Sequence, residues 1–188
     1  MNKICLFCGS SQGVRSGYLD LARDFGTALA SRGLDLVYGG ARTGLMGAAA
    51  DAALASGGRV IGVIPQSLAD MEVAHAGLTE LHLVNSMHER KALMADLSDG
   101  FAALPGGLGT LDEWFEIWTW AQLGFHHKPI GLLNFEGFFD PLLAFLDHLV
   151  AEGFVRPEHR AMAVVEREVG ALLGRLMSAN MHPGPDHP

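Results

Sequence analysis

Apolar residues fall into two kinds of segment that alternate along the chain. Short runs such as Lys3–Gly9 are apolar almost throughout, which is typical of buried strands. Longer segments such as Gly17–Arg32 carry apolar residues at helical spacing, and Gly33 follows as a stop signal. The predicted strands are Lys3–Gly9, Leu34–Tyr38, Arg59–Ile64, Glu80–Val84, Gly100–Leu104, Pro129–Leu133 and Met162–Val165. The predicted helices are Gly17–Arg32, an Ala-rich segment ending near Ser56, Ser86–Leu97 with Ser86 opening a capping box, Thr110–Leu123, a segment from Asp140 as N-cap to Gly153, and Gly170–Met177.

This alternation predicts an α/β fold. Strands that are apolar throughout suit a parallel sheet that helices cover on both faces. The 188 residues fit one domain, which we expect over residues 1–179, with residues 180–188 as a disordered tail. Ligands of such sheets bind at the carboxyl ends of the strands, so residues directly after strands are the candidates for function.

Charge and composition exclude several classes of function. The net charge is −8 and the 13 lysine and arginine residues are scattered, so the chain lacks the basic stripe of a nucleic-acid-binding protein. No apolar run reaches the ~18 residues of a membrane span. The N-terminus resembles a first strand more than a secretory signal, which predicts a cytoplasmic protein.

Cys5 and Cys8 form the one C-x-x-C arrangement in the chain. It could be a redox pair or half a metal site, or simply two small buried residues. Within a strand, a spacing of three places the two side chains on opposite faces, which favours the buried pair. No second cysteine pair and no metal-ligand spacing among the histidines supports a metal site, so we expect no metal.

Four segments follow predicted strands and carry candidate chemistry: Cys8–Ser11, Tyr38–Gly47, Met87–Lys91 and Pro105–Glu113. In the last segment, three glycines leave backbone N–H groups bare just before a helix that Thr110 would begin, a general pattern for holding a phosphate. It lacks the Lys-Ser/Thr pair of a P-loop, and it does not follow the first strand as a dinucleotide fingerprint does. A single phosphate is therefore the better expectation.

The same segment has a simpler interpretation. Thr110-Leu111-Asp112-Glu113 also fits a capping box, in which Glu113 would only close a helix end. The second Gly-rich segment, Tyr38–Gly47, favours a binding site because two such turns would converge at one edge of the sheet.

Arg90 stands out because helical spacing places it on the stripe of Met87, Met94 and Leu97, which is expected to be buried. A buried arginine needs an anion or a carboxylate as partner. That partner could be a substrate or a structural ion pair, or the side chain could extend outward to solvent.

Together, these motifs resemble those of the Lonely Guy family of cytokinin riboside 5′-monophosphate phosphoribohydrolases, many of which were formerly named as lysine decarboxylases. The family pattern is a CGSS start, Y-G-G-G-x-x-G-L-M-G, M-H-x-R-K-x-x-M and P-G-G-x-G-T-x-x-E. The chain carries these four motifs in the same order, at Cys8–Ser11, Tyr38–Gly47, Met87–Met94 and Pro105–Glu113. Two departures are small: Ala41 replaces a common glycine, and Asp112 stands where glutamate is frequent.

The resemblance implies a modified Rossmann fold, a homodimer and hydrolysis of plain or N6-modified adenosine 5′-monophosphates to free base and ribose 5-phosphate, without a cofactor. Arg90 and Glu113 match the family's catalytic pair. The residues that match or flank its substrate contacts are Ser10, Gly40, Glu72, Lys91, Gly106, Gly107, Gly109, Thr110 and Thr119.

Two other functions compete with this one. A lysine decarboxylase with pyridoxal phosphate needs a lysine for its Schiff base, and only Lys3, Lys91 and Lys128 exist, of which Lys91 alone is suitably placed. A nucleotide sensor or a molybdenum-cofactor carrier of the same fold would keep the phosphate loop without needing the pair of Arg90 and Glu113. The sequence leaves open both the preferred base and the physiological role, which could be hormone activation, salvage or housekeeping.

Overall fold

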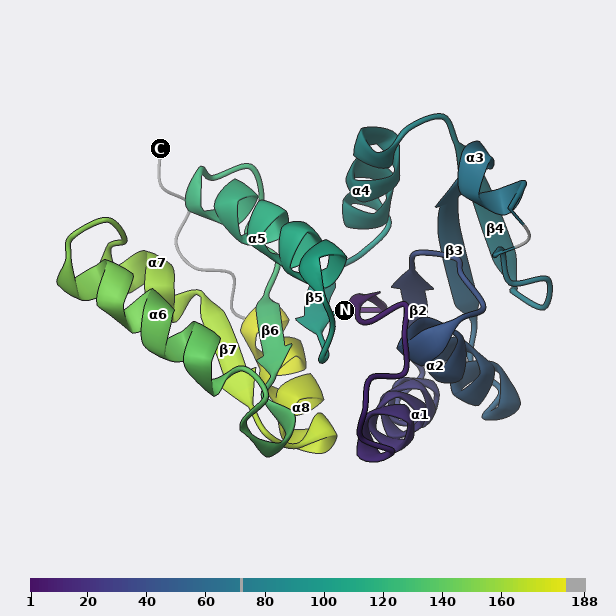
Figure 1. The fold of residues 1–188 in the computed structure, drawn as a ribbon, viewed down its shortest axis with the longest axis horizontal. Coiled ribbons are helices and arrows are strands. Elements are labelled where there is room, and N and C mark those ends of the chain that lie inside the picture. The colour runs from purple at the N-terminus through teal and green to yellow at the C-terminus, as the bar shows by residue number, and fades with distance from the viewer. Residues whose placement is uncertain (72, 182–188) are drawn as a thin grey trace.

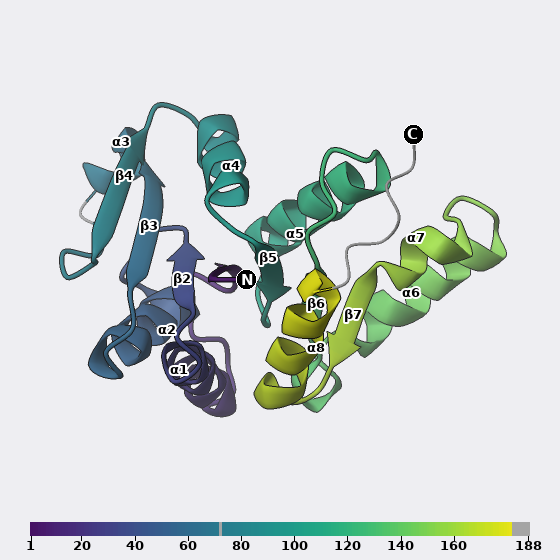
Figure 2. The same cartoon turned by 180° about the vertical axis from the view of Figure 1, so that it is seen from behind.

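The computed structural model describes residues 1–71 and 73–181, which form one seven-stranded sheet with helices on both faces (Figures 1 and 2). All neighbouring strands pair in parallel, in the order β4-β3-β2-β1-β5-β6-β7. The strands are β1 (Lys3–Phe7), β2 (Asp35–Tyr38), β3 (Val60–Pro65), β4 (Glu80–Val84), β5 (Gly100–Ala103), β6 (Ile130–Leu133) and β7 (Ala163–Glu166). The helices are α1 (Gly17–Ala30), α2 (Gly44–Ala55), α3 (Gln66–Ala69), α4 (Met87–Asp96), α5 (Leu108–Gln122), α6 (Asp140–Ala151), α7 (Pro157–Ala161) and α8 (Val169–Met181), with a 3₁₀ turn at Phe135–Gly137. The α/β class and the parallel sheet are confirmed.

Each face of the sheet carries its own apolar core, because successive strand residues point to opposite sides. Along β1, Ile4 and Leu6 pack with α1, α2 and α8, while Cys5 and Phe7 pack with α4, α5 and α6. This two-sided burial is why the inner strands are largely apolar, whereas the edge strand β4 is more exposed and carries Glu80 and His82.

The cysteines follow the same rule. Cys5 belongs to one core and Cys8, which lies just after β1, belongs to the other. Both are free thiols, and burial raises the pKa of each. They are two buried side chains on opposite faces, as the spacing indicated.

The order of strands reverses beside β1. The chain adds β2, β3 and β4 outward on one side of β1, and then returns through α4 to place β5 on the other side. The loops after β1 and β5 therefore start from neighbouring strands and run to opposite faces, which opens a crevice at the carboxyl edge of the sheet.

Two predicted helix starts were wrong by one or two residues. Helix α5 begins at Leu108 with Gly107 as N-cap, so Thr110 lies in the first turn and Glu113 in the second. Glu113 therefore cannot close the helix end, and the capping-box interpretation was wrong. Helix α6 begins at Asp140 itself, and the side chain of Asn134 accepts a hydrogen bond from the N–H of Phe139, 2.8 Å away.

The start of α4 was predicted more accurately. Ser86 is the N-cap, and its hydroxyl oxygen accepts a hydrogen bond from the N–H of Glu89 at 3.1 Å. The Glu89 carboxylate in turn accepts from the N–H of Asn85 at 2.7 Å, one residue earlier than in a standard capping box.

The end of the chain is more helical than predicted. Helix α8 runs to Met181, so residues 180 and 181 of the predicted tail are helical, and residues 182–188 lie outside the described residues. The short helices α3 and α7 were not predicted, because a single turn shows no periodicity. Within the described residues, no helix is long and apolar enough to cross a membrane.

Candidate active site

A cavity of about 390 Å³ lies at the carboxyl edge of the sheet, between the loops that follow β1, β2, β3 and β5. All four motif segments contribute to it, as the sequence predicted. The lining residues are Cys8, Ser10, Gly39, Ala41, Thr43, Met46, Ile64, Leu68, Val73, Met87, Arg90, Gly107, Leu108, Gly109, Thr110, Asp112 and Glu113.

A larger hollow, of about 600 Å³, lies over the outer surfaces of α1 and α2. It is an open groove with Asp51 as an exposed carboxylate, and it contains neither Arg90 nor Glu113. The smaller cavity is therefore the candidate active site, because it brings a buried acid, a buried cation and a helix N-terminus together.

Arg90 extends from α4 under the cavity and is buried. Its Nε donates a hydrogen bond to the carbonyl oxygen of Val63, and its Nη2 donates to that of Gly39, each at 3.1 Å. Its Nη1 lies 3.5 Å from Oε1 of Glu113, and the two side chains are only 10% and 12% exposed. The two carbonyls fix the plane of the guanidinium, which turns the Nη1 side toward Glu113.

Gly39 must be a glycine for this arrangement to exist. A Cβ atom built at Gly39 would collide with Nη2 of Arg90. The turn after β2 thus helps to position Arg90, since the backbone at Gly39 comes close enough to accept a hydrogen bond from the guanidinium.

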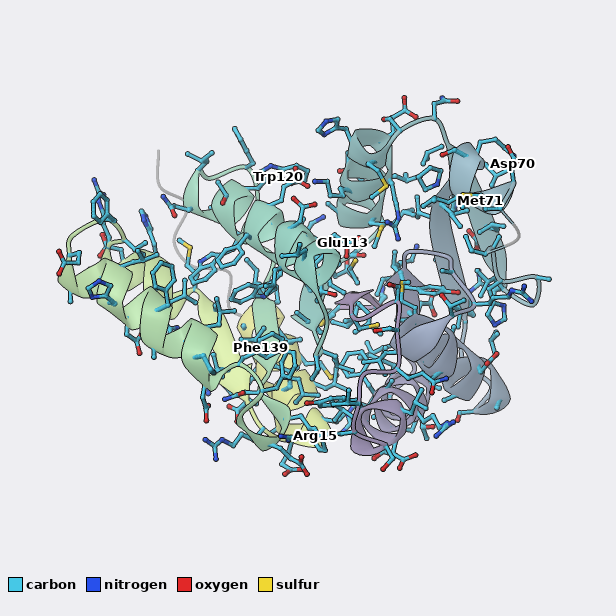
Figure 3. All side chains as sticks on the ribbon, viewed as in Figure 1. Arg15, Asp70, Met71, Glu113, Trp120 and Phe139 are labelled. Carbon is cyan, nitrogen blue, oxygen red and sulfur yellow. The ribbon has the colours of Figure 1, made fainter. Side chains whose placement is uncertain are left out.

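Glu113 lies in the second turn of α5, where this helix meets α4 (Figure 3). Burial raises the pKa of Glu113 to about 7; the charges of Asp112 and Glu116 act in the same direction, and Arg90 and Lys91 oppose them. A carboxyl group with such a pKa exists in both protonation states near neutral pH, which is the property that acid–base catalysis requires.

The N-terminus of α5 forms the other wall. Its N-cap Gly107 supplies no side-chain hydrogen bond, and the first backbone bond of the helix runs from the N–H of Leu111 to the carbonyl oxygen of Gly107, at 3.1 Å. The N–H groups of the first turn are left for a ligand, at the end of the helix dipole that favours an anion. Cβ atoms built at Gly107 and Gly109 would meet no atom within 4 Å, so both glycines border open space.

Gly106 and Gly40 are chain neighbours of residues that line the cavity. At Gly106, a Cβ atom would collide with the side chain of Thr110. At Gly40, φ is +74°, a conformation that glycine adopts without strain, and its carbonyl oxygen accepts a hydrogen bond from the N–H of His75 at 2.9 Å.

The segment after α3 also reaches the cavity; the sequence analysis placed Glu72 of this segment among the expected contacts but missed Leu68 and Val73. The N–H of Arg42 donates to the carbonyl oxygen of Val73 at 2.9 Å, and Nε2 of His75 lies 2.9 Å from Oδ1 of Asp51. These contacts bring Val73 to the cavity, and Leu68 of α3 lines the same side. Two signals pointed to this segment: it follows the carboxyl end of β3, and the resemblance placed a contact at Glu72.

Among the described residues, four predicted contacts do not line the cavity: Gly40, Gly106, Lys91 and Thr119. Lys91 forms ion pairs with Asp112 and Glu116, and Thr119 is exposed farther along α5. Glu72 lies outside the described residues.

Comparisons with known proteins give a consistent result. Residues 46–176 match the model of a family described as possible lysine decarboxylase. The cytokinin riboside 5′-monophosphate phosphoribohydrolase of Rhodococcoides fascians is 49% identical over 176 residues, which cover 93% of this chain and 89% of that protein. A probable cytokinin riboside 5′-monophosphate phosphoribohydrolase of Oryza sativa subsp. japonica is 52% identical over 174 residues, covering 93% of this chain and 77% of its own length.

Among solved structures, the molybdenum cofactor binding protein of Rippkaea orientalis has a similar fold, with a TM-score of 0.72 over 94% of this chain and 96% of that one. Its sequence identity is 21%, so the similarity concerns the fold alone.

Proposed function

The chain belongs to the family of the cytokinin riboside 5′-monophosphate phosphoribohydrolases, and from this we propose that it hydrolyses the N-glycosidic bond of adenosine 5′-monophosphates, plain or N6-modified. The bond between C1′ of the ribose and the base breaks, and its electron pair leaves with the base, which takes up a proton. The oxygen of a water molecule bonds to C1′, so that the products are the free base and ribose 5-phosphate.

The observation that carries this proposal is the buried pair of Arg90 and Glu113 beside an uncapped helix N-terminus. Breaking the glycosidic bond builds positive charge on the ribose, which a nearby carboxylate stabilises. The same carboxylate takes a proton from the attacking water. In this proposal Glu113 does both, and Arg90, held by the carbonyls of Gly39 and Val63, keeps Glu113 oriented.

The 5′-phosphate is assigned to the first turn of α5. Its N–H groups and the space beside Gly107 and Gly109 suit a dianion, and Ser10 lines the same cavity. Binding energy from the phosphate, which does not react, would then position C1′ near Glu113.

Pyridoxal phosphate chemistry, which the family description suggests, does not fit the described residues of the cavity. A Schiff base needs a lysine, and none lines the cavity. Nζ of Lys91 lies between two carboxylates, and Nζ of Lys128 donates to the carbonyl oxygen of Ala95 at 2.8 Å. Lys3 begins β1, at the opposite edge of the sheet.

A carrier or sensor function has less support. The carriers share the fold at about 20% identity, whereas the phosphoribohydrolases are about 50% identical over nearly the whole chain. A carrier also has no need of a carboxyl group with a pKa near 7 facing an arginine.

The first test is an assay of the purified protein with AMP and with isopentenyladenosine 5′-monophosphate, in which free base and ribose 5-phosphate are separated by chromatography. We expect base release from both monophosphates and none from the unphosphorylated nucleosides. Glu113→Gln should lower kcat/KM by about a thousandfold, since a general base contributes on the order of 10²–10⁴-fold. Binding of AMP without base release would rule out the hydrolase and favour a sensor or carrier.

Two further properties belong to this proposal. We expect a homodimer, which the exposed apolar side chains of Leu123, Phe125, Phe145 and Phe154 support. We also expect a cytoplasmic location, with which the two free cysteines agree.

A further inference from the structure

Lys91 is buried next to the catalytic pair without reaching the cavity. It follows Arg90 on α4, and its side chain is 11% exposed. Its Nζ lies 2.9 Å from Oε2 of Glu116 and 3.1 Å from Oδ2 of Asp112, both on α5. A lysine directed at a substrate phosphate would present its ammonium group to the cavity, and this one is surrounded by carboxylates.

The positions of these residues form a second bridge parallel to the first. Arg90 and Lys91 are adjacent on α4, and Asp112 and Glu113 are adjacent on α5, so one bridge joins Arg90 to Glu113 and the other joins Lys91 to Asp112 and Glu116. Asp112 and Glu116 are one helical turn apart and repel each other unless a cation lies between them. Lys91 therefore offsets the repulsion between the two carboxylates and attaches α5 to α4 through both of them.

The charge of Lys91 is maintained by these contacts. Burial acts to lower the pKa of Lys91, but the hydrogen bonds and charges of Glu116 and Asp112 outweigh burial and raise it. The raised pKa keeps Lys91 charged throughout the pH range in which Glu113 titrates.

We propose that Lys91 is a positioning residue for the hydrolysis, which ties Asp112 and Glu116 to α4 and so sets the separation of Arg90 and Glu113, and that it makes no contact with the substrate. This inference rests on the proposed function.

The proposal has an electrostatic consequence for Glu113. From α4, Arg90 and Lys91 lower the pKa of Glu113; from α5, Asp112 and Glu116 raise it. The buried thiols of Cys5 and Cys8 on the side of β1 are uncharged near neutral pH, because burial raises their pKa values. Removing the charge of Lys91 should therefore raise the pKa of Glu113, and removing that of Glu116 should lower it.

The kinetic test compares Lys91→Met, Lys91→Arg and Glu116→Gln, with Lys3→Met as the matched control at the opposite edge of the sheet. We expect Lys91→Met to lower kcat about tenfold or more with KM changed less than about twofold, as for a lost effect on the transition state alone. We expect kcat/KM to rise with pH as Glu113 ionises. This rising limb of the pH profile should move to higher pH in Lys91→Met and to lower pH in Glu116→Gln. Lys91→Arg should recover most of kcat, and Lys3→Met should behave as wild type.

A substrate contact would give the opposite result. If Lys91 bound the phosphate, Lys91→Met would raise KM more than it lowers kcat and would leave the limb where it is, which would overturn the proposal. Circular dichroism spectra confirm that each variant is folded, and Glu116→Gln tests the same bridge from α5 if Lys91→Met does not fold.

A second readout needs no activity. The pKa of Glu113 can be measured in each variant by NMR titration of ¹³C-labelled glutamate, with Glu113→Gln identifying its resonance. Opposite shifts of the Glu113 pKa in Lys91→Met and Glu116→Gln would support the bridge. If the wild-type protein released no base, that result would defeat the proposed function but not the bridge. An unchanged pKa in both variants would overturn the role of Lys91.

Discussion

At the scale of single residues, the site depends on keeping one carboxyl group in an unfavourable environment. Glu113 is buried between α4 and α5 beside two other acids, and a single arginine, Arg90, faces it at 3.5 Å. Its ionised form is therefore less stable in the folded protein than in water. The same property that suits Glu113 to exchange protons near neutral pH makes it a source of instability.

The raised pKa of Glu113 predicts how the stability of the folded protein changes with pH. The pKa of Glu113 is about 7 in the folded protein and 4.5 as its ordinary value, so the folded protein binds the proton more tightly than the unfolded chain. Glu113 therefore costs no stability below about pH 4.5, and its cost grows as the pH rises to about 7 and is complete above that. Glu113→Gln, which resembles the protonated acid, should be more stable than wild type by about 1 to 3 kcal/mol at pH 8 and equal to it at pH 4.

Urea unfolding of both proteins between pH 4 and pH 8 measures this difference. Other titrating groups affect both proteins alike, so the difference between the two curves isolates Glu113. A difference that does not change with pH would show that Glu113 titrates with its ordinary pKa.

The sequence could identify these residues but not all of their contacts. Arg90 stood out because a buried arginine is unusual, whereas Glu113 was singled out by the family resemblance. Leu68 and Val73 were missed, because their place at the cavity depends on how the chain folds back after β3, which no periodicity records. Lys91 was assigned to the substrate by resemblance, and its ion pairs with Asp112 and Glu116 depend on the distance between two helices.

At the scale of elements, helix α5 joins the two halves of the site. Its first turn presents N–H groups and its second turn carries Glu113, so one rigid helix fixes the distance between these N–H groups and the acid. The start of this helix was predicted two residues late, since Thr110 is a better N-cap than Gly107 by residue type. A glycine N-cap keeps side chains away from the N–H groups, which agrees with a ligand acting as the cap.

Gly109→Ala tests whether the first turn of α5 binds the phosphate. A Cβ atom at Gly109 meets nothing within 4 Å, and alanine favours a helix by about 1 kcal/mol over glycine, so the variant should be at least as stable as wild type. We expect its KM for AMP to rise about tenfold or more, because the added methyl group occupies space next to the N–H groups. Initial rates and thermal unfolding measure the two effects, and Gly174→Ala on α8, also with open space around it, is the matched control. An unchanged KM would place the phosphate elsewhere.

At the scale of the whole molecule, strand order decides which loops meet. Arg90 reaches Glu113 because β5 lies on the far side of β1 from β2, so that the crossover through α4 passes over the sheet beside α5. The number and type of strands were predictable from apolar runs. Their order was not, since a run of apolar residues states that a strand is buried but not which strand lies beside it.

The proposed homodimer belongs to this scale as well. Phe125 and Phe154 are 73% and 83% exposed, which is costly for an isolated chain. We expect light scattering to give a mass about twice that of the 20.1 kDa chain, and Phe125→Ser with Phe154→Ser to lower it. A wild-type mass of one chain at concentrations of about 100 µM, far above the dissociation constant of a stable dimer, would exclude the dimer.

The close approach of Gly39 to Arg90 restricts the order in which these two positions can change during divergence. A side chain at Gly39 would occupy the present position of the guanidinium, so Arg90 would have to give up its hydrogen bonds to the carbonyl oxygens of Val63 and Gly39 to make room. A lineage that loses Arg90 first is no longer restricted by the guanidinium at Gly39. A chain that has acquired a side chain at Gly39 would regain the arginine without its present position under the cavity, so restoring this geometry takes two changes.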